Sequence, residues 1–289
     1  MDNKTHQRLI LSLFPGIGLL DRAFEECGFC VVRGPDILWG GDIRQFHPPA
    51  GVFWGVIGGP PCQDFSGLRR TAPTGQGLEM LEQFARCVTE ASPEWWLMEN
   101  VARVPSVTGL PGHIFAELRH NYTVQRFDIN EAWYCDVTRL RHIQFGSKSG
   151  RLLNVTRRSQ KHAQRVAALA SDNRPFEELC RLQGLPDGFD LPPFLASEKK
   201  RAVGNGVPLP MGRALAQAVI AAYNSPAILQ RDLAGQVTPT KVCKCGCGRP
   251  VTGKAKYASF TCRKRAQRKR DVARSQFEKS VTCRPVTEA

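Results

Sequence analysis

The sequence has no long hydrophobic run and no segment with the pattern of a secretion signal. No stretch approaches the roughly 18 consecutive apolar residues of a membrane-spanning helix, so we expect no membrane span. The apolar segment 9–14 is too short for a signal peptide and leads directly into a glycine loop. We therefore expect a cytoplasmic protein whose 11 cysteines stay reduced and serve metal binding or catalysis before disulfides.

Acidic residues are also scarce, and the imbalance is concentrated at one end of the chain. The net charge of the 289 residues is +14, and residues 241–289 alone carry +11. The first 240 residues are thus nearly neutral, at +3. A near-neutral domain with a strongly basic appendage indicates a polyanionic partner, most simply nucleic acid. The length allows one sizeable core and a small second module.

The N-terminal third has the pattern of a nucleotide-binding α/β fold. The apolar segment 9–14 predicts a strand, and a glycine loop and a helix over 19–27 follow it. A second strand, 29–33, leads to Asp36, whose carboxylate can accept hydrogen bonds from ribose hydroxyls. Asp42 follows too closely for a crossover helix to fit between. Trp39 is equally compatible with stacking on an adenine and with a place in the core.

Cys62 is the residue around which the chemistry is organised. The apolar run 52–57 predicts a buried strand, which two glycines and two prolines end just before Cys62. Ligands of open parallel sheets bind at such strand ends, which favours a reactive thiol over a buried structural one. The following segment, 64–77, is long enough to form a lid, and an amphipathic helix is predicted over 78–91.

Three charged residues follow at the ends of later elements. Glu99 comes directly after a predicted buried strand, 93–98, where a carboxyl group should have a raised pKa and suit proton donation. A helix-capping role for Glu99 or Asn100 is the alternative. Arg139 and Arg141 alternate along an extended segment, so both guanidinium groups lie on one side and could hold phosphates or a polarised base atom.

The remaining pattern divides the chain into parts. Strands are predicted over 122–129 and 143–146, helices over 176–182 and 208–223, and a tight turn over 203–207. We assign a catalytic domain to residues 1–146 and 176–223. Residues 147–175 are basic, 224–240 form a linker, and 241–289 form a basic module suited to nucleic acid.

With these residues in place, the chain resembles the DNA (cytosine-5) methyltransferases. Six motifs stand in that family's order: Phe14-x-Gly16-x-Gly18, Gly41-Asp42-Ile43, Pro61-Cys62-Gln63, Glu99-Asn100-Val101, Arg139-x-Arg141 and Gly204-Asn205-Gly206-Val207. The resemblance spans residues 9–223 and implies a Rossmann-like, doubly wound, mostly parallel sheet, the class I methyltransferase fold.

The resemblance also implies a mechanism and a cofactor site. Cys62 would attack C6 of a flipped-out cytosine, Glu99 would hold the N3 edge, Arg141 would brace the ring, and Arg139 would hold a nearby phosphate. The S-adenosylmethionine site implied by the motifs is formed by Phe14, Gly16, Gly18, Asp36, Trp39, Asp42, Ile43, Pro61, Asn205 and Val207.

Two positions and one region depart from the family pattern. Val137 replaces the usual glutamine before the two arginines, and Ser12 replaces the usual acidic residue before Phe14. The recognition region at 147–175 is too short to form a core of its own. We therefore expect short or relaxed sequence specificity, or recognition supplied elsewhere in the chain.

The basic tail contains four cysteines that could supply that recognition. Cys243, Cys245, Cys247 and Cys262 offer four thiolates in a glycine-rich segment, which favours zinc over unligated thiols. The basic run 263–270 predicts a helix that follows a phosphate backbone. A non-specific electrostatic tether is the alternative.

The sequence thus predicts a monomeric DNA methyltransferase of a prokaryote or its phage, acting on double-stranded DNA with S-adenosylmethionine. Two alternatives stay open: a methyltransferase of RNA such as tRNA, and a non-catalytic DNA-binding protein. The intact set of Cys62, Glu99, Arg139 and Arg141 argues against the last.

Overall fold

The computed structural model describes residues 9–67, 72–157 and 173–224, together with 256, 262–264 and 266–268. It divides into two units, residues 1–227 and 228–289, and all the elements named below belong to the first. Among the described residues, no helix has the length and apolar character needed to cross a membrane.

A six-stranded, mostly parallel sheet organises the first unit. Its strands are β1 (Leu9–Leu13), β2 (Cys30–Arg33), β3 (Gly55–Gly58), β4 (Trp95–Val101), β5 (Thr123–Asn130) and β6 (Leu140–Ser147). The spatial order is β2-β1-β3-β4-β6-β5, and only β6 runs antiparallel to its neighbours. This arrangement confirms the predicted doubly wound α/β fold.

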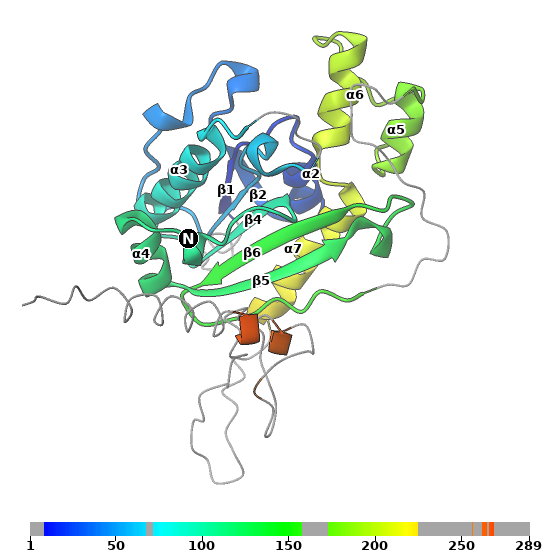
Figure 1. The fold of residues 1–289 in the computed structure, drawn as a ribbon. Helices are drawn as coiled ribbons and strands as arrows, with labels where there is room; N and C mark the ends of the chain where they lie inside the picture. The colour runs from blue at the N-terminus through cyan, green and yellow to red at the C-terminus, as the bar shows by residue number, and fades with distance from the viewer. Residues whose placement is uncertain are drawn as a thin grey trace, which may run out of the picture. The chain divides into compact units, whose positions relative to one another are not determined.

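Helices cover both faces of this sheet (Figure 1). The helices α3 (Gln76–Ala91) and α4 (His113–Asn121) pack on one face, and α2 (Leu19–Glu26) and α7 (Leu209–Asn224) on the other. Because strand side chains alternate, Trp95 faces α2 and α7 while Trp96 faces α3. Between β2 and β3 the chain forms only two short 3₁₀ turns, Ile37–Trp39 and Ile43–Gln45, as expected from the short spacing before Asp42.

A third hydrophobic core lies between two further helices and the N-terminal part of α2. It contains buried side chains of α5 (Phe176–Leu182), α6 (Ala196–Asn205) and α2. The sequence predicted α5 but not α6, and placed a tight turn where α6 ends. The prediction failed because α6 is rich in charged residues and buries only Val203 and Gly204, so its periodic signal is weak. Only Gly206, Val207 and Pro208 separate α6 from α7.

Candidate functional site

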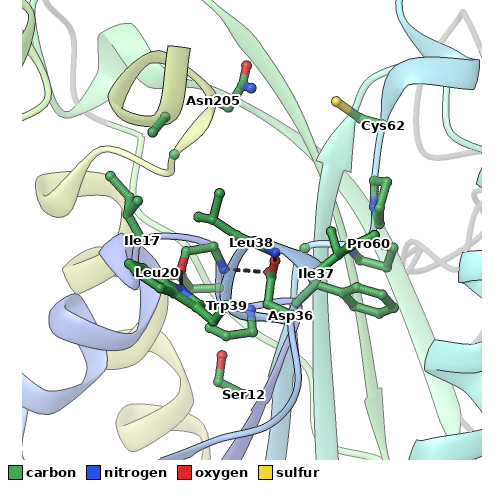
Figure 2. A pocket seen from close by; sticks show the side chains of 18 of the residues that line it. Ser12, Ile17, Leu20, Asp36, Ile37, Leu38, Trp39, Pro60, Cys62 and Asn205 are labelled. Atoms are coloured by element: carbon green, nitrogen blue, oxygen red, sulfur yellow. Dashed lines mark hydrogen bonds between the residues drawn. The ribbon is translucent and has the colours of Figure 1, made fainter. Parts of the chain in front are cut away.

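A cavity of about 870 Å³ lies at the carboxyl ends of the parallel strands, where ligands of open α/β sheets bind. Its size is within the range of small-molecule sites. The loops after β1, β2 and β3 line it together with β4, β6 and α6, and Figure 2 shows Cys62 and Asn205 on opposite sides of its opening. Of the ten predicted cofactor residues, nine line this cavity, and Gly18 does not. Gly18 instead precedes α2 in a left-handed conformation.

Hydrogen bonds join the loop after β1 to the loop after β2. The Gly16 amide donates to Asp36 Oδ2 at 2.8 Å, and the Leu38 amide donates to Asp36 Oδ1 at 2.8 Å. The Trp39 indole donates to the Gly16 carbonyl at 2.7 Å. Phe14 has φ +55°, an uncommon backbone conformation for a non-glycine residue that is found at ligand sites.

Trp39 is 58% exposed, which rules out its alternative placement in the core. Its ring contacts Phe194 edge-to-face, with centroids 5.7 Å apart. Neighbouring Ile37 is 84% exposed. These apolar groups therefore form an open wall of the cavity, with area available to a planar ring.

Two further predicted cofactor residues, Asp42 and Ile43, lie at the start of the second 3₁₀ turn, Ile43–Gln45. The Asp42 carboxylate caps the 3₁₀ turn by accepting from the Arg44 amide at 3.0 Å and pairs with the Arg44 guanidinium at 3.2 Å. Ile43 is buried at 4% exposure and contributes to the core as well as to the cavity lining.

Cys62 stands four residues beyond β3, on the opposite side of the cavity from Asn205. Asn100 supports its loop by donating from Nδ2 to the Pro60 carbonyl at 2.9 Å. In the structure, burial and the Glu99 carboxylate raise the pKa of Cys62, and the Arg141 guanidinium only partly offsets this increase.

Glu99 and Asn100 are part of β4 rather than residues beyond its end, which excludes the helix-capping alternative. Glu99 is 7% exposed and Arg141 5%. Strand pairing places them diagonally, since Glu99 pairs with Ile143 and Val101 with Arg141. Burial raises the pKa of Glu99, and nearby Arg141 and Arg139 partly counteract it. A raised carboxyl pKa is the property predicted for a proton donor at this position.

Two polar atoms of this pair have no hydrogen-bond partner. Glu99 Oε1 lies 3.1 Å from Arg141 Nε without hydrogen-bonding geometry, and Arg141 Nη2 is likewise unsatisfied. Both atoms are buried, and both residues line the cavity. Unsatisfied buried polar groups are rare and costly, so these two atoms are available to a ligand in the cavity.

Arg139 does not line the cavity, and the phosphate contact predicted for it stays a prediction. Its Nε donates to both oxygens of Glu131, at 2.8 and 3.0 Å. Its Nη1 and Nη2 donate to the carbonyls of Gly204 and Gly206. The side chain is 15% exposed, so protein groups already occupy its donors.

The sequence analysis missed Glu131. This carboxylate is fully buried and also accepts from Arg141 Nε at 2.9 Å. Its only local signal is an acidic residue directly after the end of β5, because Asn130 ends that strand and caps the turn that Glu131 begins. Val137, at the family's glutamine position, is a fully buried core residue.

A second acidic residue near the cavity was also missed. Asp21, fully buried on α2, accepts from the Ser12 hydroxyl at 2.5 Å and from Arg33 Nε at 2.9 Å. Burial raises the pKa of Asp21 against the effects of these two partners. The carboxylate absent at position 12 is thus supplied from the neighbouring helix, and both Ser12 and Asp21 line the cavity.

The predicted zinc site is not addressed by the described residues. Cys243, Cys245 and Cys247 lie outside them, as does most of the basic run 263–270, and Cys262 is buried. No cluster of three or more His, Cys, Asp or Glu suited to a metal occurs in the described part of the chain. The zinc site therefore stays a prediction.

The fold is the α/β fold of class I methyltransferases, and solved structures share it. A DNA modification methyltransferase encoded within an E. coli prophage matches with a TM-score of 0.59 at 15% identity, covering 75% of this chain and 99% of that chain. The Entamoeba histolytica methyltransferase EhMeth matches with a TM-score of 0.51 at 10% identity over 75% of this chain and 99% of its own.

Sequence comparison finds a likeness over part of the chain. Residues 40–162 match the model of the C-5 cytosine-specific DNA methylase family. Type II methyltransferase M.AquIA of Picosynechococcus sp. is 33% identical over 33% of this chain and 49% of the relative. Type II methyltransferase M.NgoPII of Neisseria gonorrhoeae is 32% identical over 32% of this chain and 33% of the relative. The chain thus spans a third to a half of these curated relatives.

Proposed function

We propose that this protein is a DNA (cytosine-5) methyltransferase that transfers a methyl group from S-adenosylmethionine to C5 of a flipped-out cytosine. One observation carries the proposal. A single cavity brings Cys62, Glu99 and Arg141 together with the predicted cofactor residues of the loops after β1 and β2. The family match of residues 40–162 supports the same reaction.

The residues present fit the cofactor. A side chain at Gly16 would meet no atom within 4 Å, so the backbone there is open to a ligand. The exposed Trp39 and Ile37 offer an apolar surface for an adenine ring, and Asn205 lies across the cavity from them. When bound, S-adenosylmethionine supplies an electrophilic sulfonium methyl group.

The chain's own residues would activate the base. The Cys62 thiolate forms a bond to C6, and the C5–C6 π electrons then make C5 nucleophilic. The buried Glu99, whose pKa is raised by burial, donates a proton to N3 and offsets the charge that develops on the ring. Arg141 holds the same ring through its unsatisfied Nη2. Methyl transfer would leave S-adenosylhomocysteine. The C5 proton then passes to water, the N3 proton returns to Glu99, and the C6–sulfur bond breaks, which frees Cys62 as a thiolate.

We further propose double-stranded DNA as the partner and a monomer as the active form. The target base must leave the helix, at a cost of a few kcal/mol, to reach a thiol in a cavity. The recognition region 147–175 is described only at 147–157 and 173–175, and its shortness supports short or relaxed specificity. We place the enzyme with the DNA of a bacterial cell or of an infecting phage.

Methylation mapping tests the proposal. The chain and its Cys62→Ala variant are expressed in cells that lack cytosine methylation, and 5-methylcytosine is mapped by bisulfite sequencing. We expect marks at a short motif with the wild-type chain and none with the variant. Unmarked DNA from cells containing folded, cofactor-binding protein would refute DNA as the substrate. Labelling of total tRNA in the same cells would then test the RNA alternative.

A further inference from the structure

We propose that Glu131 is a positioning residue that couples the base-binding arginine to the cofactor-binding turn. This inference rests on the proposed function. It assigns Arg139 to the same coupling, as the link between Glu131 and the segment that carries Asn205. The proposed unit consists of the Glu131 carboxylate, the guanidinium groups of Arg139 and Arg141, and the turn between α6 and α7.

The geometry starts from the burial of one carboxylate. Glu131 begins a single 3₁₀ turn, Glu131–Trp133, whose first amide group is capped by Asn130. Its side chain has no exposed area. The oxygen Oε1 accepts from Arg139 Nε at 2.8 Å and from Arg141 Nε at 2.9 Å. One oxygen atom thus fixes the spacing of the two guanidinium groups.

Arg139, the arginine nearer the proposed cofactor site, connects Glu131 to the turn before α7. Arg139 donates to the carbonyls of Gly204 and Gly206, which flank Asn205 on both sides. A guanidinium is a planar fork with fixed donor directions, so these carbonyls are held in one orientation relative to Glu131. Asn205 lines the cavity, and its backbone position is therefore set from β5 and β6 as well as from α6.

The arginine on the base side is aimed by the same carboxylate. The Nε atom of Arg141 lies 2.9 Å from Glu131 Oε1 and 3.1 Å from Glu99 Oε1. Its Nη2 atom has no hydrogen-bond partner among the residues described. If Glu131 did not hold Nε, the guanidinium could rotate and pair fully with Glu99. The carboxylate therefore leaves one edge of Arg141, and one oxygen of Glu99, available to a base.

Charge balance explains why this position requires a carboxylate. The cluster of Glu99, Glu131, Arg139 and Arg141 contains two groups of each sign, all nearly buried. Burial and the neighbouring Arg141 lower the pKa of Arg139, which Glu131 counteracts. Without the charge of Glu131, two guanidinium groups would face each other in a medium of low polarity.

The decisive variant is Glu131→Gln, which keeps the shape and removes the charge. Glu90→Gln is the matched control, because Glu90 also pairs with an arginine, Arg86 at 2.8 Å, and does not line the cavity. Isothermal titration with S-adenosylhomocysteine measures the cofactor side in the absence of DNA. Methylation kinetics measure both sides, as KM for the cofactor and kcat/KM for DNA.

We expect Glu131→Gln to weaken cofactor binding about 10-fold and to lower kcat/KM for DNA about 100-fold, the size of effect produced by a misplacement of about 1 Å. Glu131→Asp, which keeps the charge on a shorter side chain, should recover part of both losses. Glu90→Gln should match the wild type. A merely structural Glu131 would lower the melting temperature and leave the cofactor affinity of the folded protein unchanged, and that result overturns the inference.

The outcomes separate this inference from the proposed function. A wild-type chain that binds cofactor but methylates no DNA refutes the function, while the cofactor affinities still decide the role of Glu131. If Glu131→Gln does not fold, Arg139→Lys replaces it, since a lysine keeps the charge but cannot reach Glu131 and both carbonyls. Arg139→Lys should also weaken cofactor binding about 10-fold, and an unchanged affinity overturns the inference.

Discussion

The two walls of the cavity are built in opposite ways. The wall proposed to hold the base, called the base wall below, contains Glu99 and Arg141 on paired strands, and both are at least nine-tenths buried. The wall proposed to hold the cofactor, the cofactor wall, contains Ile37 and Trp39 in a loop, and both are more than half exposed. The chain thus buries Glu99 and Arg141 and exposes two apolar side chains at the same site.

This contrast follows from what each wall must do. A charged group keeps one orientation and an altered pKa only where neighbours fix it and water is excluded, and paired strands provide both conditions. An apolar wall gains its binding energy by losing water when a ligand covers it, so it can remain open until then. Mutations in the base wall should therefore affect reaction and folding, and mutations in the cofactor wall should mainly affect binding.

The largest expected effect separates chemistry from binding within the base wall. Cys62→Ala should lower methyl transfer by roughly 10⁴-fold or more, because loss of a nucleophile removes the covalent route. Transfer of tritiated methyl groups to DNA measures this loss, and S-adenosylhomocysteine titration should show unchanged cofactor affinity. Cys30→Ala, at an exposed thiol outside the cavity, is the control and should remain active. Residual transfer close to wild type would refute the covalent mechanism.

The next effect tests whether the base wall is also part of the folded core. Glu131→Ala should lower the free energy of unfolding by about 3–5 kcal/mol, since it leaves two buried guanidinium groups without their shared partner. Urea denaturation followed by circular dichroism measures the change. Glu90→Ala, in a partly exposed pair, should cost only about 0.2–1 kcal/mol. Equal losses in the two variants would contradict the contrast between buried and exposed pairs.

A smaller effect is expected on the cofactor wall. Trp39→Ala should weaken S-adenosylhomocysteine binding by about 1–3 kcal/mol, the usual contribution of an aromatic ring stacked on a base. Its side chain is largely exposed, so the melting temperature should change little. Leu78→Ala, at an exposed apolar residue outside the cavity, provides the control for both measurements. A Trp39→Ala protein with wild-type affinity would show that the ring does not contact the cofactor.

The smallest effect is a pH dependence of stability. Burial raises the folded-state pKa of Glu99, so ionisation destabilises the wild type as pH rises from about 4.3 through that raised value. Glu99→Gln removes this penalty, and its melting temperature relative to wild type should rise between pH 4.5 and 8. Glu79→Gln provides the opposite sign, because Arg44 lowers the pKa of that exposed carboxylate. A flat difference for Glu99→Gln would contradict a raised pKa.

Much of the fold followed from local patterns. The sequence predicted the strands near their observed positions, the short connection between β2 and β3, and α5 at its observed bounds. Each of these rests on apolar spacing and on glycine or proline at the ends. The helix α6 was missed because it is rich in charged residues and buries only Val203 and Gly204, which leaves little apolar spacing.

The candidate site was predicted less evenly. Motif residues such as Phe14, Cys62 and Asn205 do meet at one cavity, since they follow strands or precede a helix at the same edge of the sheet. Asp21 and Glu131 were missed because no pattern distinguishes a buried acidic residue from a solvated one along the chain. The partners of Arg139 could not be predicted either, since Gly204 and Gly206 lie 65 and 67 residues away in sequence.

The sequence by itself determined the class of fold, the order of the motifs and most of the cofactor residues predicted at the cavity, because apolar periodicity and turn residues act over short distances. Only the tertiary structure decided how the charges are paired. The partners of a buried ion cluster come from separate strands and turns, and their spacing is set by sheet pairing and packing. Glu131, which holds Arg139 and Arg141 together, is the residue in which that difference is clearest.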